Sequence, residues 1–445
     1  QNMSNNAAVT SVGGVIGRAQ ALQAVACGVP LHSDMNPVLL KPQADRTSQL
    51  IVHGQVRGTL GSGNFRSARG ELLGAVLESY ERLKAQCDIV VVEGAGSPAE
   101  INLRAGDIAN MGFARAANVP VILVGDIDRG GVIAAVVGTR TVIDPADAAM
   151  IRGFLINKFR GDPALFEDGY AQIAALSGWR GMGVVPWLDA VARLPSEDAV
   201  VLERRAPSVD APLVIACPVL PRISNFDDLD PLKLEPSVEL RMIGPGQVIP
   251  ADAALVILPG SKATIADMRA MVAQGWDIDI RAHHRRGGVV LGICGGYQML
   301  GRTIGDPEGI EGPPETIAGL GLLEVDTLMS SGKALHQVQG HGLEADFRGY
   351  EMHMGATSGP DCARPFAILD GGRADGAISR DGRVLGSYVH GLLASAPLRD
   401  ALMQRLGGQS AMADYAQTVG DALDEVAALL EQHADIDAMV ALAMA

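Results

Sequence analysis

Short apolar runs alternate with amphipathic segments along the first half of the chain. Glycine or acidic residues bound four runs rich in Val and Ile, at residues 89–94, 119–126, 151–158 and 183–186. Between these runs, apolar positions recur at helical spacing, as in the segments that begin at Glu71 and Asp107. Buried strands that alternate with helices predict a mostly parallel sheet with helices on both faces, which is an α/β fold.

A charged, proline-containing stretch at residues 194–212 interrupts this rhythm. Apolar runs then return as LVIACPVL, ALVILPG and GVVLGIC, so we predict two domains, over residues 1–205 and 211–445. From about Leu320 the pattern changes to period two in TLMSSGKALHQVQGHG, GYEMHMG and AISRDGRVLGSYVHG, which predicts an antiparallel extension. Residues 421–445 carry Leu, Val and Met at helical spacing and predict a packing helix.

The composition is that of a globular protein. Of 445 residues, 48% are apolar, and no stretch approaches the roughly 18 uninterrupted apolar residues of a membrane span. The net charge is −15 without any Lys/Arg-rich run, so neither nucleic acid nor a membrane is an expected partner. Five cysteines without a CxxC pair argue against disulfides and zinc, and together with the absence of a secretory signal they predict a cytoplasmic protein.

The sharpest local signal is GVVLGICGGYQMLG, which places Cys294 between an apolar run and a helical segment. Gly292 and Gly296, two residues before and after, allow the tight strand-to-helix turn that exposes a nucleophile. At such a turn the following N–H group and the helix N-terminus favour a thiolate and stabilise an oxyanion. The alternative is a buried structural cysteine in a glycine-rich turn, and the surroundings decide between the two.

A thiolate nucleophile needs a base, and His390 in VLGSYVHG is the strongest candidate. His390 ends a late predicted strand, where a neighbouring sheet edge can present it to Cys294. A single histidine is more often structural. Its pairing with an elbow cysteine about 100 residues earlier favours the catalytic interpretation.

The motifs ILPGSK, LGICGGYQMLG, GYEMHMG and SYVHGL together resemble the class I glutamine amidotransferase domain, in its cobyric acid synthase and cobyrinate diamide synthase branch. The resemblance implies a flavodoxin-like domain that hydrolyses glutamine through a thioester on Cys294, with His390 as general acid and base. It also implies that Gly260 and Gly295 form the oxyanion hole and that Gln298 lies beside the glutamine substrate.

One position departs from the pattern of many class I enzymes, which carry Glu two residues after the histidine. Leu392 stands there, as in this branch, so another acceptor must orient His390. Glu351 is a candidate for that role. An equally supported alternative is that Glu351 is a strand-edge carboxylate without a catalytic part.

The first domain resembles the same branch over nearly its whole length. The motifs are QNMSNNAAVT, GRAQALQA, MNPVLLKPQ, INKFRGD and the long segment from VVVEGAGSPAE to VGDIDRGGV. The resemblance implies a P-loop-like, dethiobiotin synthetase-like parallel-sheet domain that uses ATP. Its amide-rich N-terminal cluster, which includes Asn2, Ser4, Asn5 and Arg18, is implied to lie near a corrinoid whose carboxylates and amides need such donors. An ordinary N-terminal loop is the alternative.

Acidic and amide side chains end the predicted strands of this domain. Glu93 stands where P-loop-like folds place a carboxylate on Mg²⁺. Four further residues are expected at the ATP and substrate site, where parallel strands end: Asp126, Asp128, Asn157 and Lys158. For the carboxylates, helix capping or simple solvation at a strand end is the alternative.

Two phosphate-binding patterns bear on the nucleotide site of this domain. Residues 94–99 fit the dinucleotide fingerprint G-x-G-x-x-A, but a proline and a polar loop separate them from the next helix, so we reject it. The phosphate loop G-x-x-x-x-G-K-[ST] is absent from the sequence. Family members carry that loop just upstream of the segment that opens this chain, and the chain does not begin with Met, so we expect one β–loop–α unit to be missing.

The resemblance implies a glutamine-hydrolysing amidoligase with ATP and Mg²⁺ as cofactors. Its reaction is amidation of the b, d, e and g carboxylates of adenosylcobyrinic acid a,c-diamide to adenosylcobyric acid, in cobalamin biosynthesis. Glutamine and the corrinoid are the implied substrates. Cobyrinic acid a,c-diamide synthase, which shares both domains, and a glutaminase-competent pseudo-synthetase that does not use ATP are the alternatives.

Overall fold

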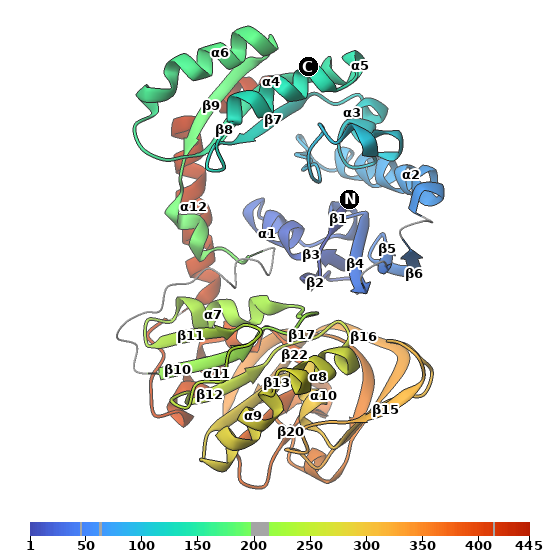
Figure 1. Ribbon diagram of the computed structural model, residues 1–445, viewed down its shortest axis with the longest axis vertical. Coiled ribbons are helices and arrows are strands. Elements are labelled where there is room, and N and C mark those ends of the chain that lie inside the picture. Colours follow the sequence, from blue (N-terminus) through green and yellow to red (C-terminus); the bar gives the residue numbers. More distant parts are fainter. Residues whose placement is uncertain (45–46, 62–64, 197–212, 413) are drawn as a thin grey trace.

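The computed structural model describes residues 1–44, 47–61, 65–196, 213–412 and 414–445. Figure 1 shows an upper lobe built from the residues before 196 and a lower lobe built mainly from the residues after 213. The domain boundary that we predict between residues 205 and 211 lies outside the described residues. Among the described helices, none combines the length and apolar character that crossing a bilayer requires.

The chain begins with a small, mostly antiparallel sheet in the order β1-β4-β5-β6 and a separate β2-β3 hairpin. The elements are β1 Asn2–Met3, β2 Ala7–Val9, β3 Val15–Gly17, α1 Arg18–Ala26, β4 Val38–Ala44, β5 Thr47–Val52, β6 Gln55–Gly61 and α2 Phe65–Lys84. Leu40 and Leu50 of the sheet share an apolar cluster with Leu72 of α2. The helix expected from Glu71 onward is confirmed by α2.

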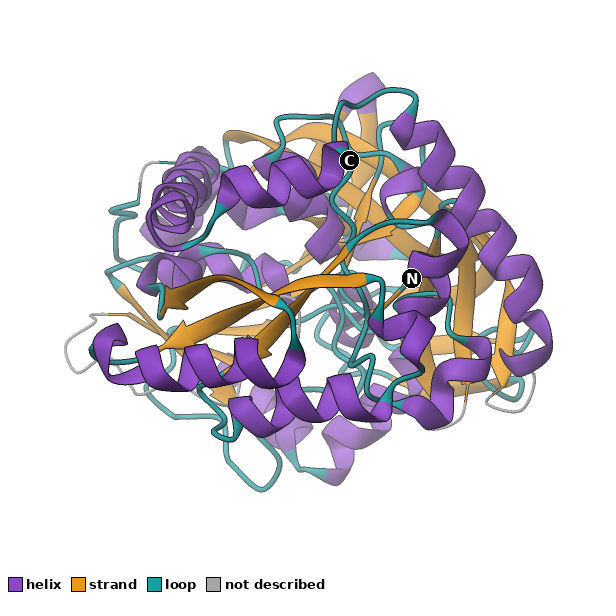
Figure 2. Cartoon of the chain, turned by 90° about the horizontal axis from the view of Figure 1, so that it is seen from above, coloured by secondary structure: helices purple, strands orange, loops and turns teal. Residues whose placement is uncertain are grey.

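A three-stranded parallel sheet follows, in the order β7-β8-β9. Three of the four predicted strands are confirmed, as β7 Val121–Asp126, β8 Ile151–Phe159 and β9 Arg180–Pro186. The helices are α3 Met111–Ala117, α4 Val132–Val142, α5 Pro145–Ala148 and α6 Glu167–Ser177. Helices α4 and α6 pack against each other and against the sheet, while α13 near the C-terminus contacts β9. Figure 2 shows helices on both sides of these strands.

The prediction of a strand at residues 89–94 is wrong. These residues have no regular secondary structure, although the next predicted strand, β7, forms in full. The reason is the lack of a pairing partner, because β7 pairs only with β8 among the described strands. Val91 is 91% exposed, so this apolar run neither pairs nor packs in the described structure.

The lower lobe is built on a six-stranded sheet in the order β11-β10-β12-β13-β21-β20, parallel except for β20. The strands are β10 Leu213–Pro218, β11 Val238–Ile243, β12 Leu255–Leu258, β13 Val289–Ile293, β20 Ala377–Ile378 and β21 Val384–Ser387. The helices are α7 Asp230–Leu234, α8 Thr264–Ala273, α9 Trp276–Arg285, α10 Gly295–Leu300 and α11 Ala396–Arg405. Val256 and its neighbour Ile257 belong to different apolar clusters, so both faces of the sheet are buried.

The predicted antiparallel extension is confirmed as a second sheet around the long β16-β17 hairpin. Its strands are β14 Thr303–Asp306, β15 Glu315–Ala318, β16 Asp326–Gly342, β17 Ala345–Ser358, β18 Ala367–Leu369, β19 Arg373–Asp375 and β22 Val389–His390. In this sheet Tyr350 of β17 is paired with His390 of β22. The second sheet therefore positions His390, the histidine that the sequence predicts as the base.

The C-terminal residues form two helices, α12 Tyr415–His433 and α13 Ile436–Met444, rather than one. The break has a physical cause, because Ala434 forms a β-bridge with Gly183 and the Asp435 N–H donates to the Met182 carbonyl. Helix α12 also contacts the short helical turn Asp189–Arg193. The C-terminal helices therefore leave the lower lobe and pack on the upper one (Figure 1).

The two lobes share an apolar cluster and several polar contacts. Val9 and Leu39 of the first sheets are clustered with Met352 of β17. Nearby, Lys262 Nζ donates to Gln49 Oε1 across 3.2 Å. The residues that begin the chain are thus packed onto the hairpin that carries Tyr350 and Met352.

Candidate active site

Cys294 lies at a strained turn between β13 and α10. Its φ is +53°, a conformation that few non-glycine residues adopt. A Cβ on Gly296 would lie 2.0 Å from the Leu258 carbonyl oxygen, so glycine is required for the close approach of the turn to β12. The Cys294 N–H donates to the Ser387 carbonyl at 2.8 Å, and the thiol sulfur lies 3.7 Å from the Met352 carbonyl oxygen. The geometry is that of a nucleophile elbow.

His390 faces Cys294 and is held from its other side by Asp228. The Nδ1–H of His390 donates to Asp228 Oδ2 at 2.7 Å, and the Gly391 N–H donates to Asp228 Oδ1 at 2.6 Å. This fixes the imidazole with Nε2 available toward Cys294, whose side chain is a hydrogen-bond neighbour of His390. His390 is 1% exposed, so the three groups form a buried acid–base–nucleophile array.

The charges around His390 favour its protonated form. Burial by itself lowers the pKa of this imidazole, but the Asp228 carboxylate and then Cys294 outweigh it and raise the pKa to about 10. At neutral pH the ring is therefore an imidazolium. Such a group can hold a thiolate and later give its proton to a leaving amine.

The suggestion that Glu351 orients His390 is wrong. Arg373 Nη1 donates to Glu351 Oε1 at 2.9 Å, and His336 lies 3.7 Å from Glu351 Oε2. Burial raises the pKa of Glu351, but hydrogen bonds from His353 and Arg373 lower it to about 2. Glu351 is paired with Val389, the residue before His390, between β17 and β22. Its carboxylate nevertheless contacts Arg373 and His336.

Asp228 is a candidate functional residue that the sequence analysis missed. It lies on a short helical turn, Phe226–Leu229, that follows β10, and Asn225 begins this turn with a positive φ of 53°. The sequence signal is the acidic run in NFDDLDPL, which lies between Arg222 and Lys233. That run does not by itself point to a histidine 162 residues away.

The three residues expected around glutamine surround the elbow. A Cβ on Gly260 would lie 3.0 Å from His390 Cε1, and one on Gly295 would lie 2.9 Å from the Ser261 nitrogen. The Gly295 N–H is the first of α10, and the first N–H groups of a helix lack intrahelical partners. Gln298 lies one turn further along α10, where its amide donates to the Met354 carbonyl at 2.9 Å and accepts from Thr264 at 2.9 Å.

The N-terminal candidates lie at the start of the first sheet. Asn2 Nδ2 donates to Gln20 Oε1 at 3.0 Å. The buried Ser4 hydroxyl closes a local turn by accepting from the Asn6 N–H. Asn5 differs from both, because its amide oxygen is buried without a hydrogen-bond partner. Such an oxygen is suited to a donor from a ligand or water.

The candidates at the ends of β7 and β8 are brought together. Asp126 is paired in register with Asn157, and Lys158 Nζ donates to Asp126 Oδ2 at 2.8 Å. This hydrogen bond lowers the pKa of Asp126. Asp128 accepts from Arg160 at 2.7 Å. Both carboxylates are therefore already engaged by cations at this sheet edge.

Glu93 is exposed and accepts a hydrogen bond from Gln23 Nε2 at 2.7 Å. No cluster of three or more His, Cys, Asp or Glu side chains in the described ranges could hold a metal ion. A site made of protein ligands alone is therefore not indicated there. Mg²⁺ commonly takes one or two carboxylates together with phosphate oxygens, and Glu93 fits that mode.

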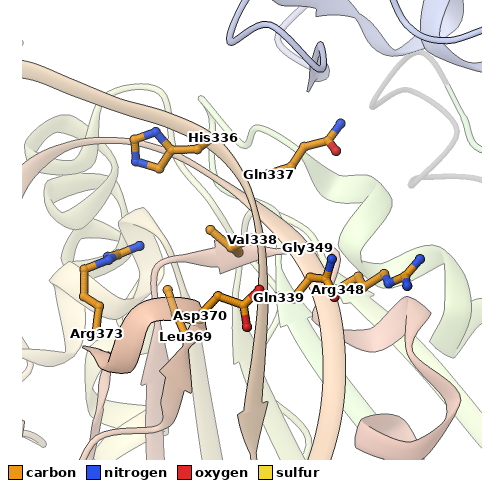
Figure 3. Close-up of a pocket in the computed structure, with 9 residues that line it drawn as sticks. All are labelled: His336, Gln337, Val338, Gln339, Arg348, Gly349, Leu369, Asp370 and Arg373. Carbon is orange, nitrogen blue, oxygen red and sulfur yellow. The ribbon is translucent and has the colours of Figure 1, made fainter.

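A separate cavity of about 430 Å³ opens on the β16-β17 hairpin (Figure 3). Its lining includes Arg348 and Gly349, next to Tyr350, but neither Cys294 nor His390. Figure 3 shows the Gln337 side chain pointing from the hairpin toward the first lobe. The charge of Arg373 in this lining is already matched by Glu351.

Comparison with known proteins gives concordant matches to both halves. Residues 214–398 match the family described as a CobB/CobQ-like glutamine amidotransferase domain, and residues 64–194 match an AAA domain. A cobyric acid synthase from Rhizorhabdus wittichii is 73% identical over 445 residues, with 100% of this chain and 92% of the relative covered. Cobyric acid synthases from Novosphingobium aromaticivorans and Sphingopyxis alaskensis are 72% and 69% identical, each covered to 91% of its length.

Proposed function

Because the chain belongs to the cobyric acid synthase family, we propose that Cys294, His390 and Asp228 release ammonia from glutamine for amidation of a corrinoid. The chain is a glutamine amidotransferase of cobalamin biosynthesis, with an ATP-using AAA domain. The observation that carries the proposal is the buried contact of an elbow cysteine with a histidine that a carboxylate orients. The b, d, e and g carboxylates of adenosylcobyrinic acid a,c-diamide are the proposed acceptors.

Glutamine hydrolysis follows from the arrangement around Cys294. The sulfur attacks the side-chain amide carbon, and the N–H groups of Gly260 and Gly295 stabilise the oxygen that becomes negative. His390 gives its proton to the nitrogen, which leaves as ammonia, and a thioester remains on Cys294. Water then attacks the thioester with His390 as base, which releases glutamate and returns Cys294 and His390 to their starting state.

Amidation needs an activated carboxylate, because a carboxylate at neutral pH is a poor acceptor for ammonia. Transfer of the ATP γ-phosphoryl group to the corrinoid carboxylate gives an acyl phosphate and ADP, and ammonia displaces inorganic phosphate. We assign Asp126, Asp128, Asn157 and Lys158 to nucleotide binding and Glu93 to Mg²⁺. Bound Mg²⁺ would supply neutralisation of phosphate charge. Asn2, Ser4 and Asn5 are assigned to corrinoid binding. The buried Oδ1 of Asn5, which has no hydrogen-bond partner, can accept a hydrogen bond from the corrinoid.

The proposed function is tested by mass spectrometry of the corrinoid after incubation of adenosylcobyrinic acid a,c-diamide with glutamine, Mg²⁺ and ATP. Both this chain and a chain extended upstream by the β–loop–α unit that the resemblance implies are used. Successive amidation up to adenosylcobyric acid by either chain supports the proposal. Glutamate release by both chains without corrinoid amidation would overturn the substrate assignment. Cobyrinic acid, supplied in parallel, detects the a,c-diamide synthase alternative.

Replacement of Glu93 with glutamine separates the two half-reactions. Corrinoid amidation should fall by at least about tenfold at limiting Mg²⁺, with glutamine or with ammonium as nitrogen donor, since the carboxylate serves only the nucleotide side. Glutamate release should not change. Glu100→Gln, an exposed charge in the same loop, is the matched control. Equal Mg²⁺ dependence of Glu93→Gln and wild-type amidation would exclude the metal role.

A further inference from the structure

A buried polar cluster joins the first lobe to the supports of His390. At its centre is Arg18, the first residue of α1, which directly follows β3 of the upper lobe. Its Nη2 lies 2.5 Å from Asp227 Oδ2 and donates to the Tyr350 hydroxyl at 2.8 Å. Both partners belong to the lower lobe, so a single guanidinium bridges the two lobes beside the glutaminase site.

The Tyr350 hydroxyl forms hydrogen bonds with three groups. It accepts from Arg18 and from Asn225 Nδ2, each at 2.8 Å, and it lies 3.4 Å from the Ala7 carbonyl, to which it donates. Its ring is stacked on His390, with centroids 5.2 Å apart and planes inclined by 20°. Because Tyr350 and His390 are also paired between β17 and β22, the position of this ring constrains the imidazole.

The second support is the turn that carries Asp227 and Asp228 side by side. Asp228 binds His390, whereas Asp227 binds Arg18. Burial raises the pKa of Asp227, and the Arg18 charge opposes that effect. Without Arg18, two adjacent buried carboxylates would repel each other, and one would have to take up a proton or move. Either change would disturb the turn that places Asp228 against His390.

We propose that Arg18 is a positioning residue through which the first lobe completes the glutaminase site, by holding both Tyr350 and the Asp227–Asp228 turn against His390. The inference rests on the proposed glutaminase function and adds a dependence of that reaction on contact between the lobes. Ammonia is then released only by molecules whose first lobe is docked. Arg18 does not touch the reacting atoms, and its effect is exerted through the orientation of the base.

The test compares Arg18→Gln, Arg18→Lys and Tyr350→Phe with the wild-type chain in steady-state glutamate release. Arg18→Gln should lower kcat by about tenfold to hundredfold with the KM for glutamine within about twofold, because a small displacement of the base affects the chemical step more than binding. Arg18→Lys should restore part of kcat. Tyr350→Phe, which keeps the stacked ring but removes the hydroxyl, should give an intermediate loss.

Arg193→Gln is the matched control, because Arg193 forms an ion pair with Glu425 of α12 on the surface of the upper lobe. It should leave glutamate release unchanged, and ammonium-driven amidation should persist in every variant. An unchanged kcat in Arg18→Gln, an equal loss in Arg193→Gln, or a parallel loss of ammonium-driven amidation would overturn the inference. Glutamate release without corrinoid amidation by both the wild-type chain and the upstream-extended chain would instead remove the substrate assignment, and the comparison of kcat with KM would still decide the role of Arg18.

Discussion

Replacing Cys294 with alanine is expected to abolish glutamine-dependent amidation while ammonium-dependent amidation continues. The reason is that the thiolate takes part only in ammonia release, so an external supply of ammonia bypasses it. Glutamate release should fall by at least about 10³-fold, since no other nucleophile stands at the elbow. The measurement is corrinoid amidation by mass spectrometry with glutamine or ammonium chloride, together with glutamate release.

Cys217→Ala is the matched control for this substitution. Cys217 is a buried thiol on β10 of the same sheet, but it lies within the strand and not at an elbow. Its loss should leave both nitrogen donors usable. If Cys294→Ala lost ammonium-driven amidation to the same extent as glutamine-driven amidation, the division of labour between the two lobes would be wrong.

The sequence pattern correctly predicted those strands that have a neighbouring strand to pair with in the described part of the chain. β12 and β13 are continuous apolar runs that pair with each other over four residues, and both lie in the middle of a sheet. Residues 89–94 have the same composition but no strand beside them, and they remain irregular. Apolar content alone therefore marks a segment that can become a buried strand, while pairing decides whether it does.

The proposed nucleophile and base, Cys294 and His390, could be predicted because local glycine spacing and strand ends are visible in the sequence. Asp228 could not be, because its contact with His390 depends on how a loop after β10 meets the second sheet. The same limit applies to Arg18, which the resemblance placed near the corrinoid together with Asn2 and which the structure places against Asp227 and Tyr350. Contacts between elements distant in the chain are set by tertiary packing, which no short motif encodes.

The short strands that begin the chain show that the same limit applies to whole elements. β1, β2 and β3 are two or three residues long, too short to carry a period of two. The burial of β2 and β3 comes from β4, β5 and the hairpin of the other lobe. The resemblance implied a parallel-sheet domain, and residues 121–186 conform to it. The antiparallel part that precedes it is what contacts the glutaminase site.

Replacing Asp228 with asparagine tests the residue that completes the catalytic array. The carboxylate orients His390 and raises its pKa, and asparagine cannot supply the charge. We expect kcat for glutamate release to fall by about 10⁴-fold, comparable to the loss of an orienting carboxylate in other histidine-dependent enzymes. Asp230→Asn is the matched control, because burial raises the pKa of Asp230 to about 7 and this carboxyl has no contact with His390 among those described.

The pH dependence gives a second readout for Asp228→Asn. Since the folded-state pKa of His390 is about 10 against an ordinary 6.5, its protonation stabilises the folded wild-type protein. That contribution is complete below about pH 6.5 and is lost as the pH rises through about 10. In Asp228→Asn the pKa of His390 should drop, because burial then acts with less opposition. The alkaline limb of the kcat/KM profile should therefore move to lower pH, and urea unfolding between pH 7 and 10 should lose its dependence on this group. An alkaline limb that stayed at the wild-type position would mean that Asp228 does not set the charge state of the base, and His390 would then owe its protonation to Cys294 alone.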